Sequence, residues 1–477
     1  MYLWPSIDAK TIRRQMTATG IGLGGIDGPW WRLARHPFVA PADVEKELVE
    51  IAEAIFLFLD VVDAQYRNAT GGHNELVRLL QYKAPPNLHY TSRNGASMRP
   101  VYGLRPDFQL HIINGHIQPV ATELEIAPSA HGFAHAMQVA YGLPTELVEQ
   151  YAEFLAGRPL LFVGTEQWSE FVLEQLAFCR ALHDAGARGL VLYDKPLRAL
   201  AAEVAAGQRW QPPMFGIPRK TADWNADIWG RIQRHGLAPF IYPHDETWPT
   251  DVGNAVVFRF GYGVNFSAHH LAYFERWRNQ GATLLNPPTF YLDSKALLCA
   301  LRLSSVREQI AATSSAALTA LDRAIPETHL LGWEGANTLL SKLQEERTQW
   351  IIKFAGFDVD NQAWGGRSVQ IGAQYSDTAW TALLKRSMHL PWPVVAQRMT
   401  PSLQIDMPYF DVAGAPALLP NGVTRLRSFM LRHGDGRITV GGNHLTVSTR
   451  QQVSEGVDAV QAPVVFGHSN LFDDNWL

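Results

Sequence analysis

The stretch WIIKFAGFDVDNQAWGGRSVQIG, from Trp350 to Gly372, decides how this sequence is interpreted. It begins as an apolar strand that contains Lys353, and a polar interval separates that strand from the pair Gly365 and Gly366. A lysine in an apolar strand costs free energy unless an anionic group meets it. Glycines have no Cβ atom, so a loop that contains them can approach a ligand closely. The stretch therefore predicts a strand and a loop that bind an anion.

The composition favours a small-molecule partner over a polymer. The chain has 477 residues, with 41 Lys+Arg against 45 Asp+Glu and a net charge of −4. This balance gives no reason to expect binding to nucleic acid or to a membrane surface. The length predicts two to four domains or one elaborate multi-lobed enzyme, and a homo-oligomer is compatible with the sequence. Cys179 and Cys299 fit no CxxC pattern, and the N-terminus does not resemble a secretory signal, so we expect a cytoplasmic protein.

Local patterns divide the chain into three kinds of segment. Residues 43–66 predict an amphipathic helix with acidic residues in its first turn. Residues 159–286 alternate between strands (PLLFVG, GLVLYD, APFIYPH, AVVFRFG, TLLN) and helices, which predicts a parallel sheet with helices on both faces. After residue 286 the pattern is α+β, and a helix capped near Asp293 or Ser294 is expected.

A β-hairpin is predicted from RPDFQLHIINGHIQPVATELEIAPSAHG, residues 105–132. It reads as two alternating strands around Asn114-Gly115, the strongest short hairpin signal. Side chains two residues apart share a strand face, so Asp107 lies on one face of the first strand while Glu123 and Glu125 share a face of the second.

These carboxylates converge only if the hairpin is irregular. A strict two-residue turn pairs position 107 with position 122 and places the acids on opposite faces. Pro119 cannot donate to the ladder and often marks a bulge, which would restore a common face. We therefore predict an irregularity at Pro119 that brings Asp107, Glu123 and Glu125 together.

The order of the motifs carries a family resemblance. The chain shows RPDF, ELEIA, NPP…SKALL, IIKF…GG and VVAQ in this order, from Arg105 to Gln397. This order is similar to the circularly permuted ATP-grasp ligases, notably the synthetase domain of glutathionylspermidine synthetase and, more distantly, eukaryotic-type glutathione synthetase. The resemblance covers most of the chain beyond residue 100.

The resemblance implies a circularly permuted ATP-grasp fold, of α/β and α+β class, with an inserted doubly wound α/β domain of the pre-ATP-grasp kind. We expect residues 1–157 to hold an N-terminal helical region and the metal-binding part of the core. Residues 158–290 would be the inserted substrate domain. Residues 291–477 would hold the ATP-binding lobe and the rest of the core.

The resemblance also implies which residues bind ATP. The triphosphate carries about four negative charges and needs cations and backbone N–H groups around it. Lys353 and Lys295 would contact the phosphates, and Gly365 and Gly366 would let the loop backbone approach them. The strand segment beside Gln397 would border the adenine.

The metal and catalytic roles come from the hairpin. The resemblance implies that Asp107 and Glu125, with Glu123 as a third candidate, coordinate Mg²⁺ at the phosphates. Arg105 would steady the charge of the transferred phosphoryl group. Ala127 stands where the family has asparagine, which removes one oxygen ligand.

The implied function is a Mg²⁺- and ATP-dependent ligase that joins a small-molecule carboxylate to an amine through an acyl phosphate. Arg259 is the candidate substrate contact, with a structural ion pair as the alternative. Ala127 motivates a second hypothesis, a nucleotide-binding protein without ligase chemistry that acts as a partner or regulatory subunit. A third, an NAD-dependent oxidoreductase, is disfavoured because GIGLGG follows a helical segment. His131 and His135 have the spacing of a zinc pair but fit core histidines better.

Overall fold

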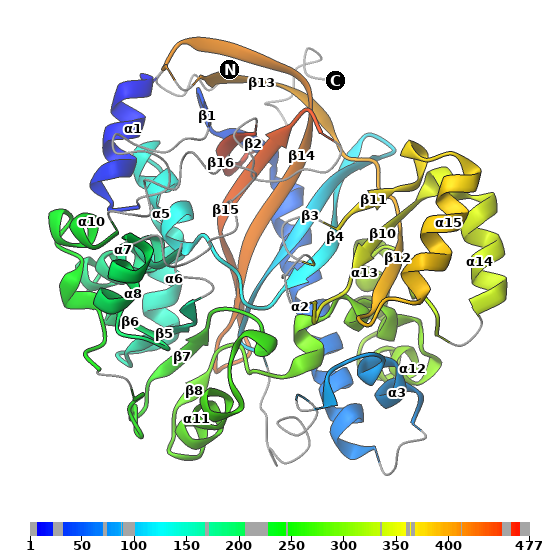
Figure 1. Cartoon of the computed structure of the whole chain (residues 1–477). Helices are drawn as coiled ribbons and strands as arrows, with labels where there is room; N and C mark the ends of the chain where they lie inside the picture. Colours follow the sequence, from blue (N-terminus) through cyan, green and yellow to red (C-terminus); the bar gives the residue numbers. More distant parts are fainter. Residues whose placement is uncertain are drawn as a thin grey trace.

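The computed structural model describes residues 7–21, 32–69, 74–86, 88, 101–166, 171–205, 228–244, 247–333, 336–358, 363, 368–411, 413–450 and 459–467. Within these residues the chain forms three β-sheets, of eight, four and four strands, with helices packed around them (Figure 1). The architecture is therefore mixed α/β, as predicted from the sequence.

The largest sheet joins the first part of the chain to the last. Its order is β13-β1-β16-β15-β14-β3-β4, with β2 paired to β16. The pairs are antiparallel, except that β1 and β2 run parallel to β16. The strands are β1 (Arg32–Ala34), β2 (Phe38–Pro41), β3 (Gly103–Ile113), β4 (His116–Glu125), β13 (Gln404–Phe410), β14 (Pro416–Arg432), β15 (Ile438–Ser448) and β16 (Val460–Gly467).

The predicted hairpin is confirmed as β3 and β4. Asn114 and Gly115 have φ of 52° and 81°, and Ile113 pairs with His116 across them. Two consecutive left-handed residues are what a type I′ turn requires, and Asn-Gly satisfies that requirement at low steric cost.

The predicted irregularity is also present, but at a different residue. Asp107 pairs with Glu123, whereas the next residue of β3 pairs with Ala121, so Thr122 is the extra residue of a β-bulge. Pro119 lies within the regular part of the ladder. The bulge places Asp107 and Glu123 directly opposite each other, and the acids share one face of the hairpin.

A second, antiparallel sheet carries the opening stretch of the sequence. Its order is β11-β10-β12-β9, and the helices α14 and α15 flank it in Figure 1. A separate apolar core containing Trp350 and Trp380 fills the space beneath it. The elements are β9 (Thr328–Leu330), α14 (Ala336–Glu345), β10 (Trp350–Phe354), β11 (Gln370–Ile371), α15 (Asp377–Met388) and β12 (Val394–Arg398).

The third sheet is the predicted parallel one and lies within residues 158–290. Its order is β6-β5-β7-β8, all parallel. APFIYPH was expected to be a strand; it instead forms the 3-10 helix η4 (Ala238–Phe240) and one bridge from Ile241 to Val191. The other elements are β5 (Leu160–Gly164), α7 (Val172–Asp184), β6 (Gly189–Tyr193), α8 (Leu197–Ala205), α10 (Ile228–Arg234), β7 (Val256–Arg259), α11 (Ala268–Asn279) and β8 (Thr283–Leu284).

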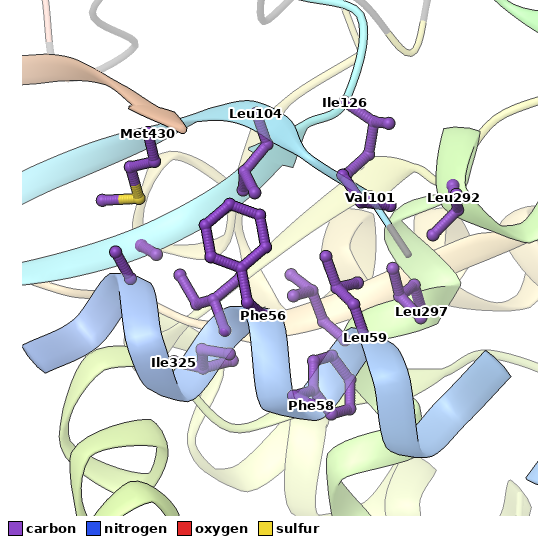
Figure 2. Packing of buried hydrophobic residues seen from close by; sticks show 14 of the residues in the cluster. Phe56, Phe58, Leu59, Val101, Leu104, Ile126, Leu292, Leu297, Ile325 and Met430 are labelled. Atoms are coloured by element: carbon purple, nitrogen blue, oxygen red, sulfur yellow. The ribbon is translucent and has the colours of Figure 1, made fainter. Parts of the chain in front are cut away.

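The helix predicted for residues 43–66 is α2 (Ala42–Asn68), and it supports the large sheet from below. Figure 2 shows Phe56 and Leu59 of α2 pointing toward Leu104 and Val101 at the start of β3. Asp43 and Glu45 lie in its first turn, where the helix dipole favours acidic side chains. Apolar burial along α2 therefore fixes the position of the hairpin that carries the acids. The helices α12 (Ser304–Thr313) and α13 (Ser315–Ala324) pack against α2, and α3 (Glu75–Gln81) packs against η7 (Lys295–Arg302).

His131 and His135 belong to a second core rather than to a metal site. The helix α5 (His131–Ala140) packs with α1 (Ala9–Ala18), α6 (Glu146–Leu155) and α7. The Nε2 of His131 lies 2.7 Å from the hydroxyl of Tyr151, and its ring packs against Phe162 and Phe258. The interpretation as a core histidine is confirmed for His131.

Among the described helices, none is both long enough and apolar enough to cross a lipid bilayer.

Candidate functional site

The acids of the hairpin face the second sheet. Arg105 pairs with Glu125 and Asp107 pairs with Glu123 along β3 and β4, so these four side chains lie on one face. Lys353 of β10 donates a hydrogen bond of 3.2 Å to the carbonyl of Thr122, the bulge residue. The site therefore lies where the cyan hairpin meets the yellow sheet in Figure 1.

Asp107 is enclosed by arginines. Its Oδ1 lies 3.2 Å from Arg427 and 3.6 Å from Arg105, and its Oδ2 lies 3.1 Å from Arg425. Burial alone would raise the pKa of Asp107, but the three guanidinium groups hold it well below its usual range. Asp107 is therefore a carboxylate anion that neutralises part of a positive cluster.

Glu123 forms an ion pair with Lys295. The two side chains approach to 2.5 Å, and Lys295 also donates to the carbonyl of Ala363 at 2.6 Å. Lys295 begins η7, whose N-cap is Ser294; the Ser294 hydroxyl accepts from the N–H of Ala296. The predicted cap is confirmed, although the helix is of 3-10 type. The cap fixes where Lys295 leaves the backbone, which directs its ammonium group toward Glu123.

Lys353 is buried at the back of the site, with 6% of its surface exposed. Its Nζ donates to Gln397 Oε1 at 2.8 Å, and Gln397 Nε2 donates to the hydroxyl of Thr328 at 3.1 Å. Burial lowers the pKa of Lys353 to about 7, an effect that nearby Glu123 opposes and Lys295 reinforces. The hydrogen-bond partners of Lys353 are neutral groups. An anion that binds Lys353 would therefore not have to displace a carboxylate from it.

An open pocket of about 180 Å³ lies between the two sheets. Cations line the pocket on several sides, and its wall also includes the connection between β12 and β13. Its lining residues are Gln109, Thr122, Glu123, Lys295, Ile351, Lys353, Ala363, Ser368, Val369, Ile371, Arg398, Met399, Thr400, Pro401, Ser402, Gln404, Val423 and Arg425.

A smaller pocket adjoins it on the far side of Glu123 and Lys295. Both acids of β4, Glu123 and Glu125, line this second pocket, together with Tyr262. Burial and then the charge of Glu123 raise the pKa of Glu125 to about 8. Two carboxylates that share a buried face repel each other, and a cation placed between them would relieve that repulsion.

Glu123 and Glu125 fit the oxygen donors that a nucleotide-bound Mg²⁺ takes. Such an ion is usually held by one or two carboxylates together with phosphate oxygens and water. Within the described part of the chain, no group of three or more His, Cys, Asp or Glu side chains is arranged to hold a metal by itself. The described residues therefore provide no complete set of metal ligands. They provide a pair of carboxylates, and phosphate oxygens would supply further ligands.

Other predicted site residues lie elsewhere or cannot be placed. Gly365 and Gly366 fall outside the described residues. The backbone of Gln397 pairs with strands on both sides, at Ile351 and Thr328, so its own N–H and C=O serve the sheet.

Arg259 is fully buried in an ion pair. It donates to both oxygens of Asp293, at 2.7 and 3.1 Å, and also to the carbonyl of Gly261. The sequence is compatible with Arg259 as a substrate contact or as part of a structural ion pair. The observed contacts are those of a structural ion pair. Arg105 likewise has protein partners, donating to the carbonyl of Ser129 at 2.5 Å.

Sequence reasoning missed Arg425 and Arg427. They stand two residues apart in TRLRSF, so they share one face of β14, and Arg427 lies directly opposite Asp107 of β3. Two arginines alternating with apolar residues in a buried strand were a usable signal. The sequence does not indicate which strand lies beside them, because β3 and β14 are separated by some three hundred residues of sequence.

Comparison with solved structures places this arrangement in a known architecture. Its fold is similar to that of a glutathione synthetase-like protein. A glutathione synthetase-like effector from Globodera pallida, solved in the apo form, matches with a TM-score of 0.53 over 98% of this chain and 100% of that one. The two sequences are 13% identical, so the likeness concerns the fold alone.

A putative gamma-glutamylcysteine synthetase from Methylobacillus flagellatus is more distant. It covers 87% of this chain and 85% of its own, with a TM-score of 0.36 and 10% identity, values too low to carry an argument. No protein-family model and no curated protein matches the chain. The synthetase-like fold agrees with the predicted ligase resemblance, while the specific resemblance to glutathionylspermidine synthetase stays a prediction.

Proposed function

We propose that the chain is an ATP-dependent ligase that joins a small-molecule carboxylate to an amine, with Mg²⁺ as the required ion. One observation carries the proposal: Lys295 and Lys353, from different segments, line the same pocket as Glu123 and Arg425. Lysine and arginine cations together with a carboxylate in one pocket match the needs of a metal-bound triphosphate.

The pocket cations would bind and orient the phosphates. Lys353 is anchored by Gln397 and the Thr122 carbonyl, so its ammonium group is already in place before a ligand arrives. A fixed cation that needs no reorganisation stabilises charge more effectively than a mobile one. Lys295 would leave Glu123 and pair with phosphate oxygens.

Glu123 and Glu125 would hold the Mg²⁺, whose role when bound is to neutralise phosphate charge and polarise the transferred group. Arg425 would stabilise the negative charge that accumulates as the phosphoryl group moves. Lys353 is buried and the side chain of Arg425 is 13% exposed, so partial removal of water strengthens both interactions.

The proposed reaction has two steps. A carboxylate oxygen of the substrate attacks the γ-phosphorus of ATP, and ADP leaves. The amine nitrogen then attacks the acyl carbon, phosphate leaves, and the nitrogen gives up a proton to form the amide. This is group transfer of the kind in which positioning and charge stabilisation provide most of the catalysis.

The test is ATP binding followed by ADP release. We expect ATP with Mg²⁺ to raise the melting temperature, and mixtures of small carboxylates and amines to release ADP. The variant Lys353→Met should show a much smaller melting shift with ATP and no ADP release while remaining folded. ATP binding without ADP release under any mixture would instead favour the second candidate, a nucleotide-binding protein without ligase chemistry, which Ala127 and the arginine-bound state of Asp107 motivate. No response to ATP would reject both.

A further inference from the structure

Asp107 differs from the other acids of the hairpin in its partners. Both of its carboxylate oxygens face guanidinium groups, from Arg425 on one side and from Arg427 and Arg105 on the other. Glu123, directly opposite on β4, instead faces the ammonium group of Lys295. The two acids of one cross-strand pair thus have different cationic partners, three arginines for Asp107 and one lysine for Glu123.

The positions of these side chains relative to the pockets differ as well. Glu123 lines both pockets and Glu125 lines the smaller one. Asp107, itself a described residue, is among the lining residues of neither. Arg425 lies between Asp107 and the larger pocket, contacting the former and lining the latter. Any ligand in that pocket would meet the guanidinium of Arg425 first.

A divalent cation is a poor partner for Asp107 in this setting. To bind one, the carboxylate would have to leave at least one charge-assisted hydrogen bond, and the ion would then face three guanidinium groups at close range. Abandoning a buried guanidinium is strongly unfavourable, because it leaves a buried charge without compensation. Glu123 pairs with a single lysine and lines both pockets, and Glu125 lines the smaller pocket.

We propose that Asp107 is a positioning residue for Arg425 and not a ligand of the metal: it orients the Arg425 guanidinium toward the anionic ligand of the pocket. This inference rests on the proposed function and corrects the metal role predicted for Asp107 from the sequence. It assigns the metal to Glu123 and Glu125 alone.

The decisive comparison is between the variants Asp107→Asn and Glu123→Gln. Each variant removes one negative charge, and the two positions are directly opposite each other in the same cross-strand pair. ATP binding is measured by calorimetry with excess Mg²⁺ and again in EDTA. Asp107→Asn should weaken ATP binding by the same factor in both conditions, roughly tenfold for one lost charge-assisted contact. Glu123→Gln should weaken binding only when Mg²⁺ is present.

A double-substitution cycle tests whether Asp107 acts through Arg425. The pair Asp107→Asn and Arg425→Gln should bind ATP as weakly as Arg425→Gln alone, because the positioning residue has nothing left to position. Fully additive losses, or a loss in Asp107→Asn confined to the Mg²⁺ condition, would overturn the inference. Wild-type protein that binds ATP in neither condition would reject the proposed function itself, which is a distinguishable result.

A measurement on the unmodified protein covers the case in which Asp107→Asn fails to fold. Crystals of the wild-type chain with Mn²⁺ and a non-hydrolysable ATP analogue locate the ion by its anomalous signal. We expect the ion on oxygens of Glu123 or Glu125, with Asp107 still bound to Arg425. A bond between manganese and a carboxylate oxygen of Asp107 would refute the assignment.

Discussion

Lys295 Nζ lies 2.5 Å from Glu123 Oε1, at the boundary between the two pockets. The proposed phosphate-binding cation and the proposed metal-binding carboxylate therefore neutralise each other before a ligand binds. A metal-bound triphosphate offers each of them a partner of opposite charge, so binding would exchange one ion pair for two. The pocket is thus stable without a ligand and is ready to receive one.

The first prediction follows from this exchange. Lys295→Met should weaken ATP binding by about tenfold to a hundredfold, since it removes one charge-assisted contact to phosphate. Lys342→Met is the matched control, because Lys342 also pairs with a glutamate, Glu327 at 2.8 Å, but lies outside both pockets. Calorimetric titration with Mg-ATP measures both variants. Equal affinities for the two would exclude Lys295 from the phosphate site.

The second prediction concerns the pH dependence of ATP binding. Burial lowers the pKa of Lys353 to about 7, so the lysine is charged below pH 7 and loses its proton above it. Phosphate stabilises the charged form, so above pH 7 binding must take up a proton, and ATP affinity should fall by up to about tenfold per pH unit. Below pH 7 this group should contribute no pH dependence.

The control for this pH profile is Lys353→Met, which should bind ATP weakly and with a flatter profile between pH 7 and 9. Titrations at several pH values on both proteins suffice. A wild-type profile as flat as that of the variant would show that Lys353 keeps its ordinary pKa or does not contact the ligand.

The third prediction distinguishes the two roles considered for Arg259. Arg259 forms a buried ion pair with Asp293. The substitution Arg259→Met removes this pair and should lower the free energy of unfolding by about 3–5 kcal/mol. Arg307→Met is the control, because Arg307 makes a similar contact with Asp322 on the surface, where such pairs contribute about 0–1 kcal/mol. Chemical denaturation measures both. Unchanged stability together with a raised KM for one substrate would instead support a substrate contact.

The fourth prediction concerns acid stability. Burial, reinforced by nearby Arg180, lowers the pKa of His135 to about 4. The unfolded chain takes up this proton near pH 6.5 and the folded chain does not. Stability from this group is therefore fully present above pH 6.5 and is lost as the pH falls toward 4, by at most about 3 kcal/mol.

His135→Gln should consequently reduce the loss of stability between pH 6.5 and pH 4, measured by denaturation at several pH values. Part of the loss should remain, because burial also lowers the pKa of His131 and His444. An unchanged pH slope in the variant would show that His135 is solvated or charged in the folded protein.

Much of the secondary structure followed from local chemistry. The Asn114-Gly115 turn was predictable because few residues adopt two consecutive left-handed conformations at low cost. The helix α2 was predictable because its apolar residues recur at helical spacing and its acids stand at its start. APFIYPH was misassigned because an apolar segment of this length fits a strand or a short helix equally well, and packing decides between them.

The site was predicted in part, and the contacts that were missed have a physical cause. The sequence indicated the site residues Lys295, Lys353 and the acids of β4, because lysines in apolar surroundings and acids on one strand face need partners. The sequence did not indicate the arginine partners of Asp107. Its assignment to a metal depended on the acids of its own hairpin, whereas Arg425 and Arg427 reach it from a strand far along the chain.

The sequence by itself determined most of the strands and helices, and which side chains carry charge into apolar surroundings, because both depend largely on short-range chemistry. Only the tertiary structure decided which charges meet. The pairing of β14 with β3 brings two arginines onto Asp107, and the approach of η7 to the hairpin brings Lys295 onto Glu123. Electrostatic partners are set by distance in space, which sequence separation does not reveal.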